Sequence, residues 1–156
     1  MGESLKMLDH TQAKEVLKGK FYKKILPKLW EFIERKTLPK EISLEAENLF
    51  EFRLLLEFFD IAEKDIINTI AHENAHANKA SSFENKGVKH LGYMLKITVA
   101  KNGESTFMPQ ARLGFPDEFR ELKKDHKEII KAVYSAPLEY GDKLSPNDIE
   151  VINKLG

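Results

Sequence analysis

The run His-Glu-Asn-Ala-His at residues 72–76 contains the side chains of this sequence most suited to chemistry. It lies in a stretch whose pattern predicts a helix over about 61–79. Side chains four residues apart share one face of a helix, so His72 and His76 can bind one Zn²⁺ through neutral imidazole rings. Glu73 lies about 100° further round, within reach of a metal-bound water without being a ligand. The spacing predicts metal-assisted hydrolysis, in which the metal lowers the pKa of the water and Glu73 takes its proton.

The helix around this run is expected to be amphipathic. On a helical wheel the residues beside His72 are polar, whereas Ile66, Ile67, Ile70 and Ala77 lie on the far side. This pattern predicts one face anchored in the core and one face open to a cleft. The alternative is a polar helix face with two solvated histidines and no metal.

The longer run Thr69–Ala77 resembles the extended consensus of the zincin metallopeptidases, including the Thr at its start and uncharged residues between the histidines. The resemblance covers about ten residues, and it implies that His72 and His76 bind zinc and that Glu73 is the general base. Asn74 and Asn78 depart from it, because the family usually has apolar residues on that side.

A catalytic zinc site needs three protein ligands and one open position. His90, fourteen residues after His76 on a new segment, is the preferred third ligand. A His after a loop of this length, starting another helix, is similar to the arrangement in the SprT-like zincins. The rival is Glu121, since 121–125 fits the Glu-x-x-x-Asp pattern of the gluzincins, in which the Glu binds zinc. That segment is rich in charge, so a solvated helix face is the competing interpretation.

Composition limits the partners, the zinc ligands and the location to be expected of this protein. The chain has 156 residues, 25 basic and 25 acidic side chains and no cysteine. Zero net charge argues against a nucleic acid partner. The absence of cysteine leaves histidine and carboxylate as zinc ligands. No apolar run is long enough to span a membrane, and the first residues lack the apolar core of a signal peptide, so a cytoplasmic location is the default expectation.

The elements that must position these residues are mostly helical. The pattern predicts a short tail over residues 1–10, a helix from Thr11 that ends or bends at Pro27, and a helix over 44–59 capped by Ser43. Asp60 with Glu63 is expected to cap the histidine helix. Further helices are expected over 117–135 and after Ser145, where Pro146 and Asp148 favour the first turn.

The clearest β-element is a hairpin at 95–109 with Asn102-Gly103 as its turn, whereas no strand is expected before residue 61. Residues 109–116 are expected to form a loop. The sequence therefore predicts a compact, mostly helical α+β fold, with one metallopeptidase-like domain over 11–156.

The expected function is a small zinc metallopeptidase that cleaves peptide bonds of a peptide or protein substrate. One of Tyr93, Tyr134 and Tyr140 could donate a hydrogen bond to the oxyanion, and the sequence does not choose among them. The alternative is a non-catalytic helical interaction module that binds a structural metal or none. Substrate identity and oligomeric state are not determined by the sequence.

Overall fold

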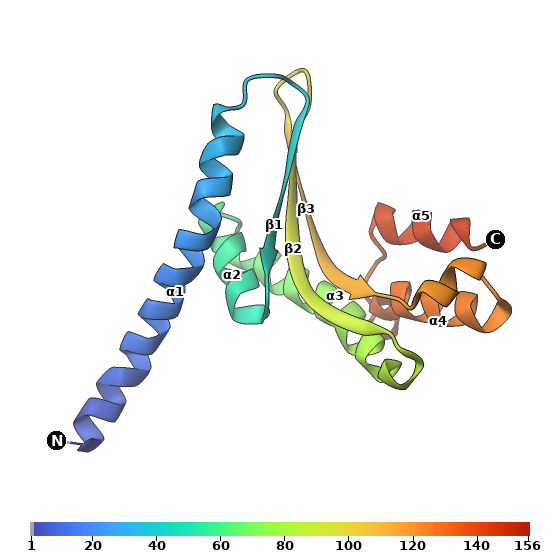
Figure 1. Cartoon of the computed structure of the whole chain (residues 1–156), viewed down its shortest axis with the longest axis horizontal. Helices are drawn as coiled ribbons and strands as arrows, with labels where there is room; N and C mark the ends of the chain where they lie inside the picture. The colour runs from blue at the N-terminus through green and yellow to red at the C-terminus, as the bar shows by residue number, and fades with distance from the viewer. Residues whose placement is uncertain (1) are drawn as a thin grey trace. The chain divides into compact units, whose positions relative to one another are not determined.

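The computed structural model describes the backbone from residue 2 and the side chains from residue 12. It confirms the predicted α+β class: the described part contains five α-helices and one antiparallel sheet, in which β2 lies between β1 and β3 (Figure 1). The residues group into two compact units, and the single domain expected over 11–156 stays a prediction. The division falls within the strands.

Unit 1 comprises residues 1–44 and 96–108 and contains helix α1 (Gly2–Glu34). The helix continues through Pro27, where the sequence predicted an end or a bend. The tail expected over 1–10 was wrong for residues 2–10, which belong to α1, although their side chains lie outside the described residues. The buried face of α1 recurs at helical spacing and consists of Phe21, Ile25, Leu29 and Phe32. Trp30, expected in the core, falls off this face and is 63% exposed.

A lysine ends α1. Lys40 Nζ donates hydrogen bonds to the carbonyl oxygens of Phe32 at 2.9 Å and Arg35 at 2.8 Å, and it lies over the Phe32 ring. The last carbonyl groups of a helix have no partner within the helix, and a cation is favourable there.

The helix expected over 44–59 is instead strand β1 (Lys40–Ala46) followed by helix α2 (Leu49–Phe58). Leu44 and Ala46 are fully buried at every second position, which is the period of a strand. Asn48, not Ser43, caps α2 by accepting a hydrogen bond from the Glu51 N–H at 2.9 Å. The expectation of no strand before residue 61 was therefore wrong.

The predicted hairpin turn is confirmed. The Ala100 N–H donates to the Glu104 carbonyl at 2.9 Å, and Gly103 takes a φ of 87°. The strands β2 (Lys89–Val99) and β3 (Ser105–Gly114) are longer than predicted. Residues 109–114, expected as a loop, extend β3, because proline is tolerated on an edge strand.

Unit 2 comprises residues 45–95 and 109–156. Helix α3 (Glu63–Ser82) contains the histidines; α4 (Lys124–Tyr134) and α5 (Pro146–Lys154) follow, with short 3₁₀ helices η1 (Glu84–Lys86), η2 (Asp117–Glu121) and η3 (Ala136–Tyr140). The helix predicted over 117–135 is thus divided into η2 and α4. One apolar cluster joins these elements, and it is formed by Ala80, Val88, Phe119, Ile130 and Val133.

The predicted Asp60 cap of α3 was wrong. Asp60 has a φ of 57°, which places it in the left-handed region just after α2, and Ala62 precedes α3 without a side-chain cap. Glu63 instead pairs with Arg53, which joins α3 to α2.

Among the described residues, no helix has the length and apolar character needed to cross a membrane.

We expect Gly92→Ala to destabilise the protein by about 2 kcal/mol or more, because Gly92 has a φ of 128° and a Cβ there would lie 2.6 Å from the Ala46 carbonyl oxygen. Gly19→Ala is the control: Gly19 lies inside α1 with open space around it, so alanine should stabilise by roughly 0.5–1 kcal/mol. Urea unfolding measures both, and equal stability of the two variants would contradict the prediction.

Candidate metal centre

Helix α3 places His72 and His76 one turn apart on the same face, as their spacing predicted. This face is not an open polar surface, however. His76 is 3% exposed and Glu73 is 5% exposed, because α3 packs against α2, α4 and η3. An ion pair between Lys79 and Glu139, with a 2.7 Å N–O distance, also joins α3 to η3. The histidines therefore lie in a mostly enclosed site.

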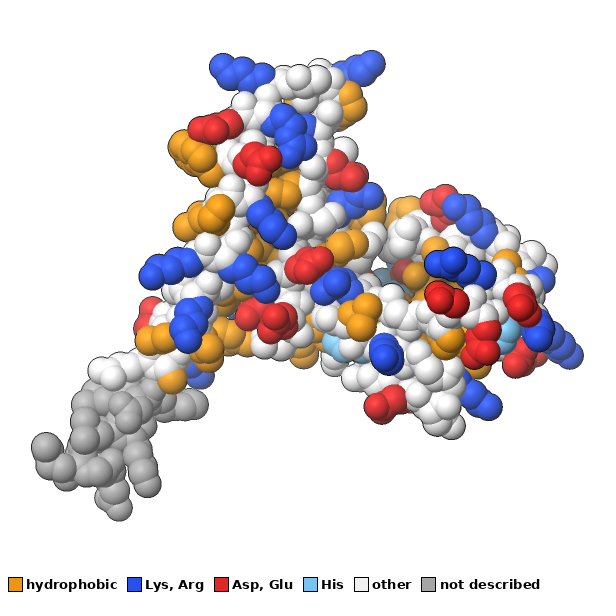
Figure 2. Space-filling model, viewed as in Figure 1, with side chains coloured by type: hydrophobic (Ala, Val, Ile, Leu, Met, Phe, Trp, Pro, Cys, Tyr) orange, Lys and Arg blue, Asp and Glu red, His pale blue; other side chains and the backbone are white. Residues whose placement is uncertain are grey.

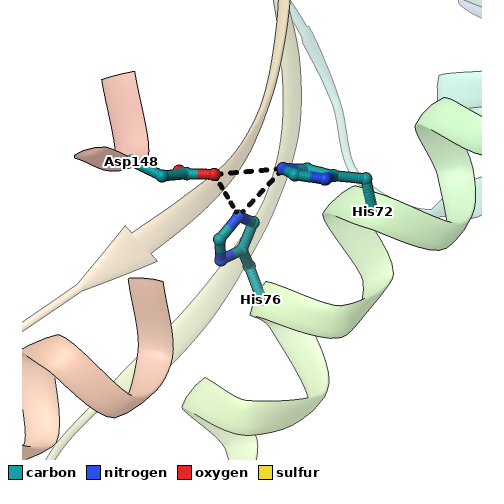
Figure 3. A group of neighbouring side chains, drawn as sticks. All are labelled: His72, His76 and Asp148. Carbon is teal, nitrogen blue, oxygen red and sulfur yellow. Dashed lines mark hydrogen bonds and ion pairs between the residues drawn. The ribbon is translucent and has the colours of Figure 1, made fainter. Parts of the chain in front are cut away.

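The third member of the site is Asp148, in the first turn of α5 (Figure 3). Its Oδ2 lies 3.1 Å from the Nε2 atoms of both His72 and His76, and these two nitrogens are 3.3 Å apart. His72, His76 and Asp148 form the group of described residues that could hold a metal ion.

This triangle fits a zinc ion. Ligand atoms about 2.0–2.1 Å from a tetrahedral Zn²⁺ lie roughly 3.3 Å from one another. The three observed separations of 3.1–3.3 Å match that edge length without rearrangement. Two imidazoles and a carboxylate are also ligand types that zinc accepts.

The hydrogen bond made by Nδ1 of each histidine fixes the orientation of its ring, with Nε2 toward the triangle. His76 Nδ1–H donates to the Val133 carbonyl oxygen, and His72 Nδ1–H donates to Asp142 Oδ2, both at 2.8 Å. In the neutral rings each Nε2 is then an unprotonated acceptor pointing at the triangle. Three acceptors would face one another with no donor, so the site requires a cation, either a proton or a metal ion. Such carboxylate or carbonyl partners orient metal-binding histidines generally.

The pKa values of His72 and Asp148 also indicate a site that favours a cation. Hydrogen bonding to Asp148 raises the pKa of His72 to about 9 although burial opposes it. Burial alone would raise the pKa of Asp148, but the hydrogen bonds with His72 and His76 outweigh it and hold that pKa well below its usual range. The site therefore attracts positive charge.

Glu73 is the unusual carboxylate of the site. Burial raises its pKa to about 7, and the nearby histidines only partly oppose this. The backbone N–H of Ala111 on β3 hydrogen-bonds to the carboxylate, while Oε2 is buried without a hydrogen-bond partner in the described part of the chain. Its Oε1 lies 4.0 Å from His72 Nε2. A carboxylate with a pKa near neutrality can both take and return a proton.

His90, the expected third ligand, does not join this group. It lies on β2 rather than at the start of a helix, its Nε2 is 3.0 Å from the Gly92 carbonyl oxygen, and its ring packs edge-on against Tyr93. The rival Glu121 ends η2 and pairs with Lys123 at 3.3 Å on the surface. Asp148 is instead the carboxylate near the two histidines, with its Oδ2 atom 3.1 Å from both Nε2 atoms.

The three candidate tyrosines differ in their surroundings and in their exposure. The Tyr134 ring centroid lies 6.0 Å from that of His76, and burial raises the pKa of its hydroxyl. The Tyr93 hydroxyl donates to Asn74 Oδ1 at 3.3 Å, which gives the polar Asn74 a partner on a neighbouring segment. Tyr140 is 71% exposed.

Asp148 was visible in the sequence only as a residue that favours a helix N-terminus. The structure bears this out: the Ser145 hydroxyl accepts from the Asp148 N–H, and Asp148 Oδ2 accepts from the Ser145 N–H, both at 3.1 Å. No local signal connected it to histidines more than 70 residues away. Asp142 was missed altogether, and no pattern around it indicates its role.

Comparison with family models, curated proteins and solved structures found no match to this chain.

We expect one zinc ion per chain, with Asp148→Asn weakening zinc binding at least as strongly as loss of a supporting residue, which typically costs 10–100-fold. His90→Ala is the control and should bind zinc like the wild type, because His90 lies outside the triangle. Zinc titration against a competing chelator, with metal content by mass spectrometry, measures both. Loss of zinc in His90→Ala with retention in Asp148→Asn would restore the sequence-based ligand set.

For the metal-free protein we expect stability to fall as the pH rises from about 6.5 to about 9. A histidine whose pKa is raised on folding stabilises fully below its unfolded value of about 6.5, and this contribution disappears as the pH passes the folded value of about 9. Urea midpoints with chelator present measure the effect. Asp148→Asn should show a smaller pH dependence, and an unchanged dependence would show that the His72–Asp148 pair is not its source.

Proposed function

We propose that this protein is a zinc-dependent hydrolase, and specifically a small metallopeptidase. The observation that carries the proposal is the triangle of His72 Nε2, His76 Nε2 and Asp148 Oδ2, which has the edge lengths of a zinc site and lies beside a buried glutamate. When bound, zinc would act as a Lewis acid and lower the pKa of a water molecule.

Glu73 is the proposed proton carrier. Its pKa of about 7 lets it accept a proton from the attacking water and later return it to the leaving amine. The buried Oε2 has no other described partner, so it is the oxygen available for this proton. The Ala111 N–H on β3 hydrogen-bonds to the same carboxylate.

A peptide substrate is supported by strand β3, which is an edge of the sheet. The Ala111 N–H is directed at Glu73 and not at β2, so the main chain at Ala111 faces outward. Alternation places Pro109 and Leu113 on the same outer side, and Pro109 there loses no ladder hydrogen bond. An extended peptide could add to this edge by main-chain hydrogen bonds and so lie beside Glu73.

Tyr134 is the proposed donor to the oxyanion that forms during attack. Among the three candidate tyrosines, it packs beside His76, whereas Tyr93 already hydrogen-bonds to Asn74 and Tyr140 is exposed. A preorganised donor in a water-poor site stabilises a developing negative charge better than water does.

One observation favours the alternative of a non-catalytic structural metal. Glu73 Oε1 is 4.0 Å from His72 Nε2, so a small side-chain rotation could make Glu73 a fourth protein ligand. A structural zinc site has four protein ligands and no open position.

The Glu73→Gln variant separates these functions. If Glu73 carries the proton, the variant should bind zinc with nearly wild-type affinity and lose turnover of a quenched peptide library by about 10²-fold or more. If Glu73 is a ligand, zinc affinity itself should fall. Wild-type turnover in Glu73→Gln would refute the assigned role, and the absence of zinc binding by the wild type would refute the metal site.

A further inference from the structure

The zero net charge of this chain conceals an uneven distribution. Unit 1 contains 12 Lys and Arg against 7 Asp and Glu, whereas unit 2 contains 13 against 18. Unit 1 therefore has a formal net charge of +5 and unit 2 of −5. A charge of this size on one unit attracts partners of opposite sign, whatever the total.

Helix α1 concentrates the positive charge of unit 1. From Val16 to Trp30 it contains five lysines and no acidic residue, and Lys20, Lys23, Lys24 and Lys28 are exposed. Figure 2 shows basic and hydrophobic side chains gathered together along this helix. The segment therefore offers both kinds of contact from one rigid element.

The apolar side chains in question are separate from the buried face of α1. Leu26, Trp30 and Ile33 recur at helical spacing and are 45%, 63% and 56% exposed. On a helical wheel they lie roughly 100° from the centre of the buried face, and Lys20 and Lys23 flank them on the other side. We call these five residues the lysine–tryptophan surface. Exposed aliphatic and aromatic side chains gathered in this way mark an interaction site.

We propose that the lysine–tryptophan surface of α1 binds the surface of an anionic lipid bilayer. Leu26, Trp30 and Ile33 would enter the interfacial layer, while Lys20 and Lys23 contact the headgroup phosphates. A helix lying in the interface combines lysines with tryptophan and leucine in this manner, and tryptophan prefers the level of the headgroups. This proposal is independent of the metal centre, which lies in unit 2.

Two other partners fit less well. The phosphates of a nucleic acid would bind the lysines and a base could stack on Trp30, but exposed leucine and isoleucine side chains would gain no specific contact. A second copy of the chain would bring the lysines of one helix against those of the other, which is unfavourable. Both become outcomes of the experiment.

The test uses full-length protein and vesicles made of equal parts phosphatidylserine and phosphatidylcholine. Trp30 is the only tryptophan of the chain, so its fluorescence reports directly on this surface. We expect co-sedimentation with these vesicles and a blue shift of the emission, and neither with pure phosphatidylcholine. Lys20→Gln/Lys23→Gln should weaken binding roughly 25-fold, because each lysine near an anionic surface contributes about fivefold.

Matched variants control for general loss of charge or apolar surface. Ile33→Ser should weaken vesicle binding, whereas Ile67→Ser should not, although Ile67 on α3 is equally exposed at 55%. Lys64→Gln/Lys89→Gln is the charge control in unit 2. Circular dichroism should show that each variant is folded.

Three results would overturn the proposal. They are the absence of vesicle binding by the wild type, equal binding to neutral and anionic vesicles, and a wild-type dimer that dissociates in Ile33→Ser and does not bind vesicles. Tight binding to single-stranded DNA, with quenching instead of a blue shift and no vesicle binding, would assign the surface to nucleic acid.

Discussion

The carboxylate of Asp148 is the group on which the organisation of unit 2 depends. One oxygen accepts from the Ser145 N–H at the start of α5 and lies 3.1 Å from both histidines of α3. The same residue thus stabilises the first turn of α5 and lies against both histidines. Val151 of α5 and Leu155, which follows α5, pack on the apolar cluster that contains Val133, whose carbonyl oxygen accepts a hydrogen bond from His76. Apolar packing and the polar site therefore support each other, and breaking one should loosen the other.

The burial of Glu73 is the second constraint, and it has a cost. A buried carboxylate with an unpartnered oxygen destabilises a fold unless a nearby charge or a proton compensates. In this protein the compensation comes from the neighbouring histidines and from the main chain of β3. Perturbed carboxylates of this kind are concentrated at functional sites, which is why Glu73 rather than an exposed acidic residue draws attention.

Unit 1 differs from unit 2 in its exposed apolar side chains and in its formal charge. Its helix buries one apolar face and leaves a second apolar stretch exposed beside lysines, while its formal charge is opposite to that of unit 2. A total charge of zero had argued against partners of strong charge. That argument uses the charge of the whole chain, whereas electrostatic attraction acts over about a Debye length, so a partner senses the charge of the nearest surface.

The sequence by itself determined what depends on local periodicity. Helical spacing put His72 and His76 on one face, the Asn-Gly pair defined the hairpin, and the cap at Ser145 defined the start of α5. Tertiary structure decided the rest. His90 lies apart from the two histidines because its segment pairs as a strand, and Asp148 lies beside them because folding brings α5 to α3 across 72 and 76 residues of chain. Contacts of that separation depend on how apolar faces pack together, and no short window of sequence contains that information.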